Sequence, residues 1–388
     1  MRARGTLPSL VQRKLRLSTK IKKIKAKKNL FVRSYLKISD LIKRPLKALW
    51  AHVRKWVFQK GISQTIWARV YYFFFNPSFG REQSAVLAGR ALYEKTQGVS
   101  GDTAALVRRN VHRLEKGLLM RPRRVPFALD YLEETVQAFS RAASFKDWDP
   151  EEKRWASDVL AEYFRVHDSR PETVSIQGLF EKSKKKNGDE SSFSTPLIPY
   201  QRNLESPLPV TLDQLKALAA RRRSVRWFQQ KPVDRALVDH ALEIGAQAPS
   251  ACNRQPFIFR IFDDPDLVRK VVAIPFGTAG YRENIPVIAV VVGQQRHFFC
   301  ERDRHLIYID ASLAVMGFLY GLEVQGLSSC CINWPDVPQL EMEMGRLLRL
   351  QPDERPIMLV AIGYPDPEGM VAASQKKSLN LLRSFNFE

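Results

Sequence analysis

Four arginines and a serine gather in one short stretch of the C-terminal half. Residues 221–228 read RRRSVRWF, so that Arg222, Arg223 and Arg226 flank Ser224. A guanidinium donates hydrogen bonds in a rigid fork that matches phosphate and carbonyl oxygens, and a hydroxyl adds one more donor. The stretch therefore indicates a site for an anionic, oxygen-rich ligand, although an arginine run taken alone is more often a solvated surface.

A second polar stretch offers a surface to a flat ring. Residues 248–257 read APSACNRQPF, and Pro249, Ser250 and Ala251 let a planar ligand approach the backbone. The amides of Asn253 and Gln255 present donors and acceptors to the edge of a heterocycle. An ordinary polar loop that leads into a strand is an equally good interpretation.

Two further clusters complete the candidate set. Residues 326–334 place Ser329, Cys330 and Cys331 in a short segment that ends in Trp334, and Gly363-Tyr364-Pro365 is followed downstream by Lys376 and Lys377. The two lysines either neutralise a phosphate or are solvated as part of a tail. The cysteines are expected mainly to pack, with a reactive thiol as the minor alternative.

Several common chemistries lack their signatures. The sequence contains no G-x-G-x-x-G, no Walker A loop and no G-x-S-x-G elbow, which argues against a dinucleotide-binding Rossmann site, a P-loop and a serine hydrolase. His297, Cys300 and His305 are close in sequence but follow no recognised zinc spacing. We therefore predict no metal site and no fixed-period repeat.

Residues 210–388 alternate between helix and strand patterns. Thr211 and Gln214 have the spacing of a capping box at a helix start, and the β-branched run Pro286–Gly293 predicts a central strand buried on both faces. The other predicted elements are helices over Asp234–Ile244, Pro265–Ile274 and Ile307–Gln325, and strands over Phe257–Phe262, Ser329–Trp334 and Ile357–Gly363.

The chain before this region divides into three predicted parts. Residues 1–80 form a basic N-terminal arm, 81–170 a helical segment, and 171–209 a proline- and lysine-rich linker. In the helical segment the periodicity predicts helices over Glu82–Tyr93, Asp102–Leu119, Pro126–Ala143 and Pro150–His167.

The net charge of +22 is concentrated at the N-terminus. Residues 1–60 hold 19 of the 62 Lys and Arg but only one of the 40 acids, Asp40, which leaves the remaining 328 residues nearly neutral. Leu46, Leu49, Val53 and Val57 recur at helical spacing with cations between them, which is typical of a helix lying on an anionic membrane surface. Aromatic residues follow at Trp67 and over 71–75, and they either anchor at such an interface or pack onto the next domain.

Two alternatives to membrane binding stay open for the arm. Charge runs such as that between Lys20 and Lys28 are often merely solvated tails. Nucleic-acid binding is disfavoured, because no aromatic residue is interleaved with the cations before Phe31 and no nucleic-acid-binding fold is indicated.

The cysteines and the hydropathy pattern suggest a compartment. Four cysteines without a C-x-x-C pair fit a reducing environment. No signal-peptide pattern follows the N-terminal charges, and the longest apolar run, Val70–Phe75, is far shorter than the roughly 20 residues of a membrane span. We expect a cytoplasmic protein that is peripheral at the inner face of the membrane.

In their order along the chain, these clusters resemble the nitroreductase family of flavoproteins. The resemblance covers about residues 210–388, and Asp310–Ala314 looks like the start of the family's long core helix. A second resemblance lies upstream, where Asn110–Leu118 is similar to the helical extension on nitroreductase-like proteins of bacterial polysaccharide biosynthesis loci.

The first resemblance implies an α+β fold, a nitroreductase-like α/β/α sandwich with a mainly antiparallel sheet, which binds FMN at a homodimer interface. By resemblance, Arg222, Arg223, Ser224 and Arg226 hold the phosphate, ribityl chain and pyrimidine edge of FMN. In the same way, the isoalloxazine or its partner-chain side would contact Pro249, Ser250, Ala251, Asn253 and Gln255. The strand whose backbone faces the flavin would contain Ser329, Cys330 and Cys331, and the C-terminal contact to the phosphate would come from Lys376 and Lys377.

The implied activity is that of an FMN-dependent NAD(P)H oxidoreductase. Turnover is expected to be ping-pong, with hydride passing through flavin N5 to a small, electron-poor acceptor, and no catalytic side chain is predicted because the cofactor carries the difficult step. The second resemblance adds an expected link to cell-surface polysaccharide biosynthesis. The alternative is a low-turnover flavin-fold scaffold in a membrane-associated polysaccharide assembly.

Overall fold

The computed structural model describes residues 47, 49–100, 104–168, 170–186 and 195–386. Internal contacts divide the chain into two compact units, Met1–Gly80 and Arg81–Glu388, and each is described by itself. The lysine run between Lys20 and Lys28 lies outside the described residues.

The described part of the first unit contains two consecutive helices. Residues 49–63 are helical, Gln64 adopts an extended conformation, and α2 (Thr65–Phe74) follows. The short 3-10 helix η1 (Pro77–Phe79) begins after Asn76, whose side chain caps it. The predicted amphipathic helix is thus confirmed from residue 49 onward, while Leu46 lies outside the described residues.

The second unit begins with five helices. All four helices predicted for residues 81–170 are present, with ends shifted by a few residues: α3 (Gly80–Thr96), α4 (Ala105–Leu119), α5 (Leu129–Ala142) and α6 (Pro150–Val166). Asp149 caps α6 by accepting a hydrogen bond from the Glu152 N–H, and Pro150 occupies the first helical position, where a missing donor costs nothing. Leu114, Leu132 and Tyr163 are buried in a shared apolar core.

The predicted linker over 171–209 is wrong in its first half. Residues Pro171–Lys186 form the helix α7, and Phe180 is completely buried between Phe139 and Phe164 in the core of the helical segment. The lysines of 182–186 belong to the solvated face and led to the prediction of a linker. The helix forms because the few apolar residues on its other face are buried. From residue 195 to 210 the described chain has no helix or strand.

A four-stranded antiparallel sheet forms the centre of the C-terminal region. Its strands are β1 (Phe257–Phe262), β2 (Val287–Gln294), β3 (Ser328–Asn333) and β4 (Glu354–Gly363), in the order β1-β2-β4-β3. Val290 of β2 lies opposite Arg260 of β1 and Leu359 of β4, so β2 is paired on both edges. This confirms the central buried strand predicted from its β-branched sequence.

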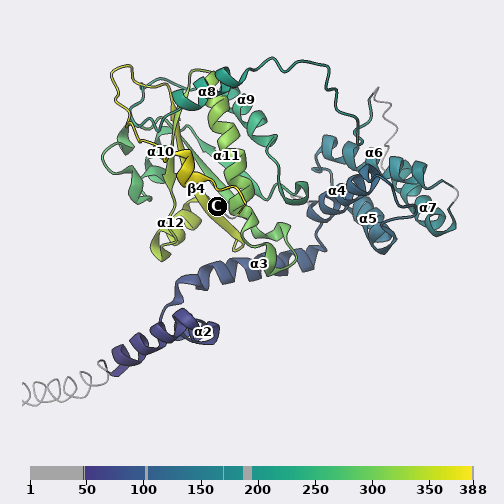
Figure 1. The fold of residues 1–388 in the computed structure, drawn as a ribbon, viewed down its shortest axis with the longest axis horizontal. Helices are drawn as coiled ribbons and strands as arrows, with labels where there is room; N and C mark the ends of the chain where they lie inside the picture. The colour runs from purple at the N-terminus through teal and green to yellow at the C-terminus, as the bar shows by residue number, and fades with distance from the viewer. Residues whose placement is uncertain (1–46, 48, 101–103, 169, 187–194, 387–388) are drawn as a thin grey trace, which may run out of the picture. The chain divides into compact units, whose positions relative to one another are not determined.

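Helices cover both faces of the sheet, as the α/β/α prediction requires (Figure 1). Alternate residues of β2 face opposite sides: Val287, Ala289 and Val291 contact α9 (Arg235–Ala246) and α11 (Leu306–Val324). Ile288, Val290 and Val292 belong to the other core, with α10 (Pro265–Val272) and α12 (Pro338–Leu348). Two short helices are α8 (Leu212–Arg221) and α13 (Leu379–Leu382), and the 3-10 turns are η2 (Ala251–Asn253), η3 (Phe276–Thr278), η4 (Arg282–Asn284), η5 (Gln295–His297) and η6 (Glu301–Asp303).

Within the described residues, one segment is long and apolar enough to cross a membrane. It is Glu301–Val324, which contains α11, and more than half of its apolar stretch is buried inside the sandwich. The segment is therefore the core helix of the fold.

Glycines allow α9 and α11 to approach closely. A β-carbon added at Gly321 would lie 2.7 Å from the Ala241 Cα, and one at Gly317 would lie 3.2 Å from the Gly245 Cα. The first distance is shorter than real β-carbons show and the second is tighter than most of their contacts, so a larger residue at Gly321 would force the two helices apart.

We therefore expect Gly321→Ala to lower the free energy of unfolding by about 1–3 kcal/mol, as overpacking of a core does. Gly345 of α12 is the matched control, because a β-carbon there meets nothing within 4 Å. Gly345→Ala is expected to raise stability by roughly 0.5–1 kcal/mol through the better helix propensity of alanine. Urea denaturation followed by circular dichroism measures both, and equal stability of the two variants would contradict this packing.

Candidate flavin site

The arginine loop lies along the edge of β3. After α8 ends, Ser224 forms a parallel bridge with Ser329, and the Val225 N–H donates to the Ser329 carbonyl at 3.0 Å. Val225 and Phe228 are buried in the sheet core, which fixes the loop at two points. The loop is further held by Asn284, which donates to the Phe228 carbonyl and accepts from its N–H. The structure thus brings Arg222–Arg226 next to Ser329, Cys330 and Cys331, as predicted.

The guanidiniums of this loop are available for an anion. Arg221, at the end of α8, pairs with Glu323 at 3.1 Å. Arg222, Arg223 and Arg226 have no carboxylate partner in the described parts of the chain. Uncompensated cations gathered beside a strand edge are the donor set that a phosphate and a pyrimidine edge require, so the residues fit FMN.

Tyr281 extends this cluster, although no motif in the sequence singles it out. The Arg226 guanidinium lies 5.8 Å from the centre of the Tyr281 ring, and the phenolic oxygen is 4.0 Å from the Cys330 sulfur. Burial, together with Cys330, raises the pKa of Tyr281 to about 12, which Arg226 opposes. Tyr281 is therefore a neutral hydroxyl at physiological pH, and a packing partner that orients Arg226.

The two cysteines of β3 face in different directions. Cys330 is buried in the sheet core and Cys331 is exposed to solvent. Although part of its side chain is accessible, partial burial and the neighbouring Cys330 raise the pKa of the Cys331 thiol to about 11, and Arg222 opposes this. A thiol with such a pKa is protonated at neutral pH, which argues against a nucleophilic role.

The second predicted loop has an unusual backbone. Cys252, Asn253 and Gln255 all have positive φ angles, of 54°, 52° and 48°. Three hydrogen bonds hold this shape: Ala251 N–H to the Asp310 carboxylate at 3.0 Å, Gln255 N–H to the Ser250 hydroxyl at 3.2 Å, and the Gln255 amide to the Asn253 side-chain oxygen at 3.0 Å. A shape that costs strain and is held in several places is typical of a binding loop.

The two loops are anchored at opposite ends of α11. Asp310 holds the second loop, whereas Glu323 holds Arg221 at the start of the arginine loop. Thirteen residues separate the two carboxylates, which is about 20 Å along a helix at 1.5 Å per residue. Among the described residues, no hydrogen bond or ion pair joins the two loops. One chain therefore presents two separate halves of the predicted site.

The predicted lysines are not joined to either loop. The chain leaving β4 first runs beside the arginine loop, since the Asp366 N–H donates to the Trp227 carbonyl at 3.0 Å. Lys376 and Lys377 follow ten residues later in an extended, fully exposed segment. Their phosphate contact stays a prediction.

The helical segment contacts the second loop directly. The Arg108 guanidinium of α4 donates to the Asn253 carbonyl at 3.3 Å and pairs with Glu152 of α6 at 2.8 Å. Arg254, which is almost fully buried, lies 3.6 Å from Asp303 and stacks on Phe298. Neither Arg108 nor Arg254 was predicted, because both act through partners that are distant in the sequence.

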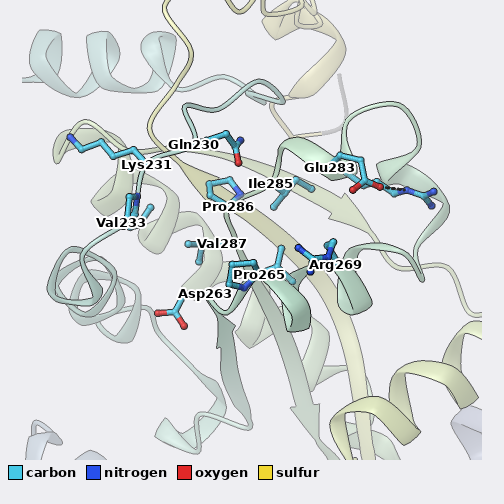
Figure 2. Close-up of a pocket in the computed structure, with 13 residues that line it drawn as sticks. Gln230, Lys231, Val233, Asp263, Pro265, Arg269, Glu283, Ile285, Pro286 and Val287 are labelled. Atoms are coloured by element: carbon cyan, nitrogen blue, oxygen red, sulfur yellow. Dashed lines mark hydrogen bonds and ion pairs between the residues drawn. The ribbon is translucent and has the colours of Figure 1, made fainter.

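Two cavities lie near the sheet. The first, of about 370 Å³, is lined by residues such as Lys231, Asp263 and Arg269 and contains none of the predicted site residues (Figure 2). The second, of about 570 Å³, is open and lies beside Gln255, with Arg108 and Glu152 in its wall.

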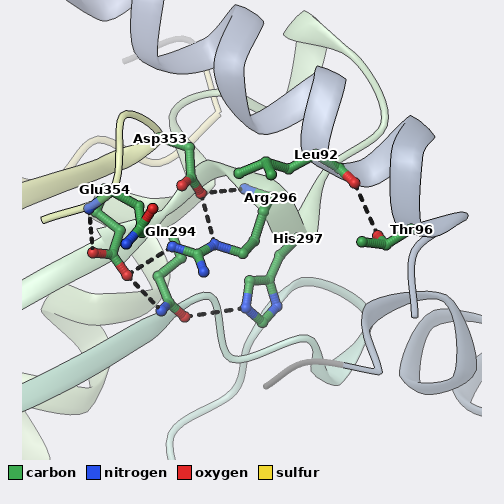
Figure 3. A network of polar contacts seen from close by, with 8 residues as sticks. Leu92, Thr96, Gln294, Arg296, His297, Asp353 and Glu354 are labelled. Atoms are coloured by element: carbon green, nitrogen blue, oxygen red, sulfur yellow. Dashed lines mark hydrogen bonds and ion pairs between the residues drawn. The ribbon is translucent and has the colours of Figure 1, made fainter. Parts of the chain in front are cut away.

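A polar network forms part of the wall of the second cavity (Figure 3). Arg296 donates to Asp353 at 2.9 Å and to Glu354 at 2.7 Å, and His297 contacts Gln294 at 3.2 Å. His305 lies instead near Glu82, at 3.6 Å. In the described part of the chain, no three His, Cys, Asp or Glu side chains are grouped as metal ligands.

Known proteins match the region that carries both loops. A model of the nitroreductase family matches residues 219–281 and 276–364. An NADH dehydrogenase of Thermus thermophilus is 30% identical over 200 residues, which cover 43% of this chain and 93% of that protein. This chain belongs to the nitroreductase family. The family is in general FMN-dependent, and membership confirms the predicted fold and supports the predicted class of enzyme, a flavin oxidoreductase.

More distant relatives show the breadth of the nitroreductase family. Iodotyrosine deiodinase 1 of Rattus norvegicus is 21% identical over 265 residues, covering 61% of this chain and 91% of that protein. Among solved structures, an FMN-dependent nitroreductase from Clostridium difficile is 19% identical and covers 44% of this chain and 98% of that chain, with a TM-score of 0.38.

The contact between α4 and the second loop generates a prediction. Arg108→Ala removes the bond to the Asn253 carbonyl, so amide hydrogen exchange in residues 249–257 is expected to become faster. One hydrogen bond contributes about 0.5–1.5 kcal/mol, which corresponds to roughly two- to tenfold faster exchange. Mass spectrometry of the peptide fragments measures it.

Glu152→Gln is the control, because it keeps an acceptor for Arg108 and leaves the bond to Asn253 in place. This variant is expected to exchange like the wild-type protein in residues 249–257. Unchanged exchange in Arg108→Ala would show that the helical segment does not hold the loop.

Proposed function

We propose that this protein is an FMN-dependent NAD(P)H oxidoreductase with two equivalent sites, each built from two copies of the chain. The observation that carries the proposal is the loop of three guanidiniums beside β3 that have no carboxylate partner in the described residues, in a chain that belongs to the nitroreductase family. FMN, when bound, supplies a group that accepts a hydride from one substrate and gives it to another.

Different residues of the arginine loop suit different parts of the cofactor. Arg222 and Arg223 are half-buried and stand first in the loop, which suits the phosphate. Ser224 and Arg226 are exposed and suit the ribityl chain and the pyrimidine edge. A fixed positive charge at Arg226 would favour the additional negative charge of the reduced cofactor, because oriented charges stabilise developing charge without reorganising.

The family implies a ping-pong exchange in which NAD(P)H and an electron-poor acceptor use the same site in turn. The names of the relatives include an NADH dehydrogenase and iodotyrosine deiodinases, which act on different molecules. This breadth supports the reaction class and leaves the acceptor defined only as small and electron-poor. A link to polysaccharide biosynthesis rests on the resemblance of Asn110–Leu118.

The alternative is a flavin-binding scaffold that hardly turns over. A single observation separates the two: NADH is expected to bleach the flavin absorption of the purified protein under anaerobic conditions, and an electron-poor quinone or nitroaromatic to restore it. Flavin that stays oxidised with both NADH and NADPH would favour the scaffold.

An exposed apolar stripe on α11 supports a site made from two copies. Ile309, Leu313 and Met316 are 52%, 46% and 38% exposed and lie at helical spacing on the side of α11 that faces away from the sheet. The same helix anchors both half-sites through Asp310 and Glu323. Packing of this stripe against its copy would bury it and bring the second loop of one chain toward the arginine loop of the other.

The first prediction from this proposal concerns the cofactor. Arg222→Ala and Arg226→Ala are each expected to weaken FMN binding by about 10- to 100-fold, since a hydrogen bond to a charged group contributes roughly 1.5–3 kcal/mol. Fluorescence titration of the apoprotein with FMN measures the change. Arg235→Ala is the control, because that exposed arginine of α9 pairs with Asp263 outside the site. Wild-type affinity in both loop variants would remove the site assignment.

The second prediction concerns assembly. Leu313→Asp places a charge in the α11 stripe and is expected to yield a folded monomer without flavin, because burying an unpaired carboxylate opposes association. Leu267→Asp on α10 is the control, since Leu267 is similarly exposed, at 40%, on the other side of the sheet. Light scattering with simultaneous absorbance measures mass and flavin together. A flavin-loaded monomer, in either variant or in the wild type, would contradict the proposal.

A further inference from the structure

The first unit forms a hairpin of two helices that is built almost entirely from aromatic contacts. The ring centres of Trp56 and Trp67 are 4.9 Å apart, those of Phe58 and Tyr71 5.4 Å, and those of Trp50 and Phe75 4.6 Å. Trp50, near the start of the described helix, contacts Phe75 just after the end of α2, whereas Trp56 and Phe58 contact Trp67 and Tyr71 earlier in α2, so the two helices run antiparallel. We name residues 49–75 the aromatic hairpin.

A glycine permits this close return of the chain. A β-carbon at Gly61 would lie 3.2 Å from both the Cα and the N of Ala68, so the second helix passes directly against the end of the first. The turn between them consists of the single non-helical residue Gln64. The hairpin is therefore a defined element and not two independent helices.

The aromatic hairpin has almost no interior of its own. Of its residues, Val57 alone is buried in the described structure. Large apolar side chains are instead exposed: Phe73 is 80% exposed, Ile62 76%, Phe74 61% and Ile66 60%. So much exposed apolar surface on so small an element indicates that a membrane or a partner molecule covers it.

The charge of the hairpin identifies what covers it. Between Leu41 and Arg81 the sequence contains no Asp or Glu, while Arg54, Lys55, Lys60 and Arg69 all lie in the hairpin. A second copy of the hairpin would bring like charges together without any acid to compensate them. Nucleic acid would satisfy the cations but would leave aliphatic side chains such as Ile62 and Ile66 uncovered.

An anionic lipid surface satisfies both features. Tryptophan and tyrosine favour the boundary between headgroups and acyl chains, and long cationic side chains reach lipid phosphates from the same depth. The return helix α2 has 10 residues, or about 15 Å, which is only half of the roughly 30 Å hydrocarbon core. The hairpin therefore lies in the interface and does not span it.

We propose that the aromatic hairpin, residues 49–75, inserts its aromatic and aliphatic side chains into the interfacial region of an anionic membrane, while Arg54, Lys55, Lys60 and Arg69 contact lipid phosphates. The proposal is independent of the flavin chemistry, since it concerns a unit that is separate from the nitroreductase sandwich. It assigns the insertion to the hairpin itself and predicts binding that the preceding basic arm alone does not provide.

The test uses the full-length protein and two sets of vesicles, phosphatidylcholine alone and phosphatidylcholine in which about a third of the lipid is phosphatidylglycerol. Ile62→Ser/Phe73→Ser removes the two most exposed of the hairpin's large apolar side chains. The matched control is Leu204→Ser/Leu208→Ser, whose leucines are equally exposed, at 80% and 79%, in the second unit. Both variants keep the complete basic arm, and circular dichroism and flavin content confirm that both are folded.

The wild type and the leucine control are expected to sediment with the anionic vesicles and to be released as salt rises. The hairpin variant is expected to bind the anionic vesicles at least about tenfold more weakly than the wild type, because it loses two inserted side chains. Brominated acyl chains should quench tryptophan fluorescence of the wild type but much less that of the hairpin variant. Equal sedimentation of both variants would overturn the proposal, and so would hairpin-dependent self-association without lipid or binding to DNA in place of vesicles.

Discussion

Two carboxylates on one buried helix hold the candidate site together. Asp310 accepts a hydrogen bond from the backbone N–H of Ala251, and Glu323 pairs with Arg221, so α11 anchors both loops of the proposed cofactor site. Both carboxyl groups are nearly buried, and burial raises the pKa of Asp310 while the Ala251 N–H and Arg254 oppose that rise. A buried carboxylate is tolerated only when such partners are present, so the loops and the helix stabilise one another.

The position of α11 also supports the proposal that a complete site takes two chains. The helix packs on the sheet and, through its glycines, closely against α9, and these two contacts leave Leu313 and Met316 facing outward. Its two ends hold the two loops about 20 Å apart along the helix axis, at 1.5 Å per residue. A second copy related by a two-fold axis would exchange the ends, and each arginine loop would then meet the second loop of its partner.

Some elements and site residues could be predicted from the sequence, and others could not. The central strand β2 and the core helix α11 could be predicted because their own composition requires burial on all sides, and the arginine loop could be predicted from its residue types and its place before a helix. The helix α7 was missed because its lysines dominate the pattern, and α12 was not predicted although Leu340, Met344 and Leu348 recur at helical spacing. Tyr281, Arg108 and Arg254 could not be found, because each acquires its role from a contact with a residue far along the chain.

The central claim is that each flavin site takes one loop from each of two chains, and subunit complementation tests it most directly. Arg226→Ala and Asn253→Ala, expressed separately, are each expected to bind little FMN. When the two are co-expressed, half of the dimers are mixed and one of the two sites in each mixed dimer is intact, so about a quarter of the wild-type flavin content is expected if the dimer has two-fold symmetry. No recovery of flavin in mixed dimers isolated with two affinity tags would contradict a shared site and would indicate that both loops of each site belong to the same chain.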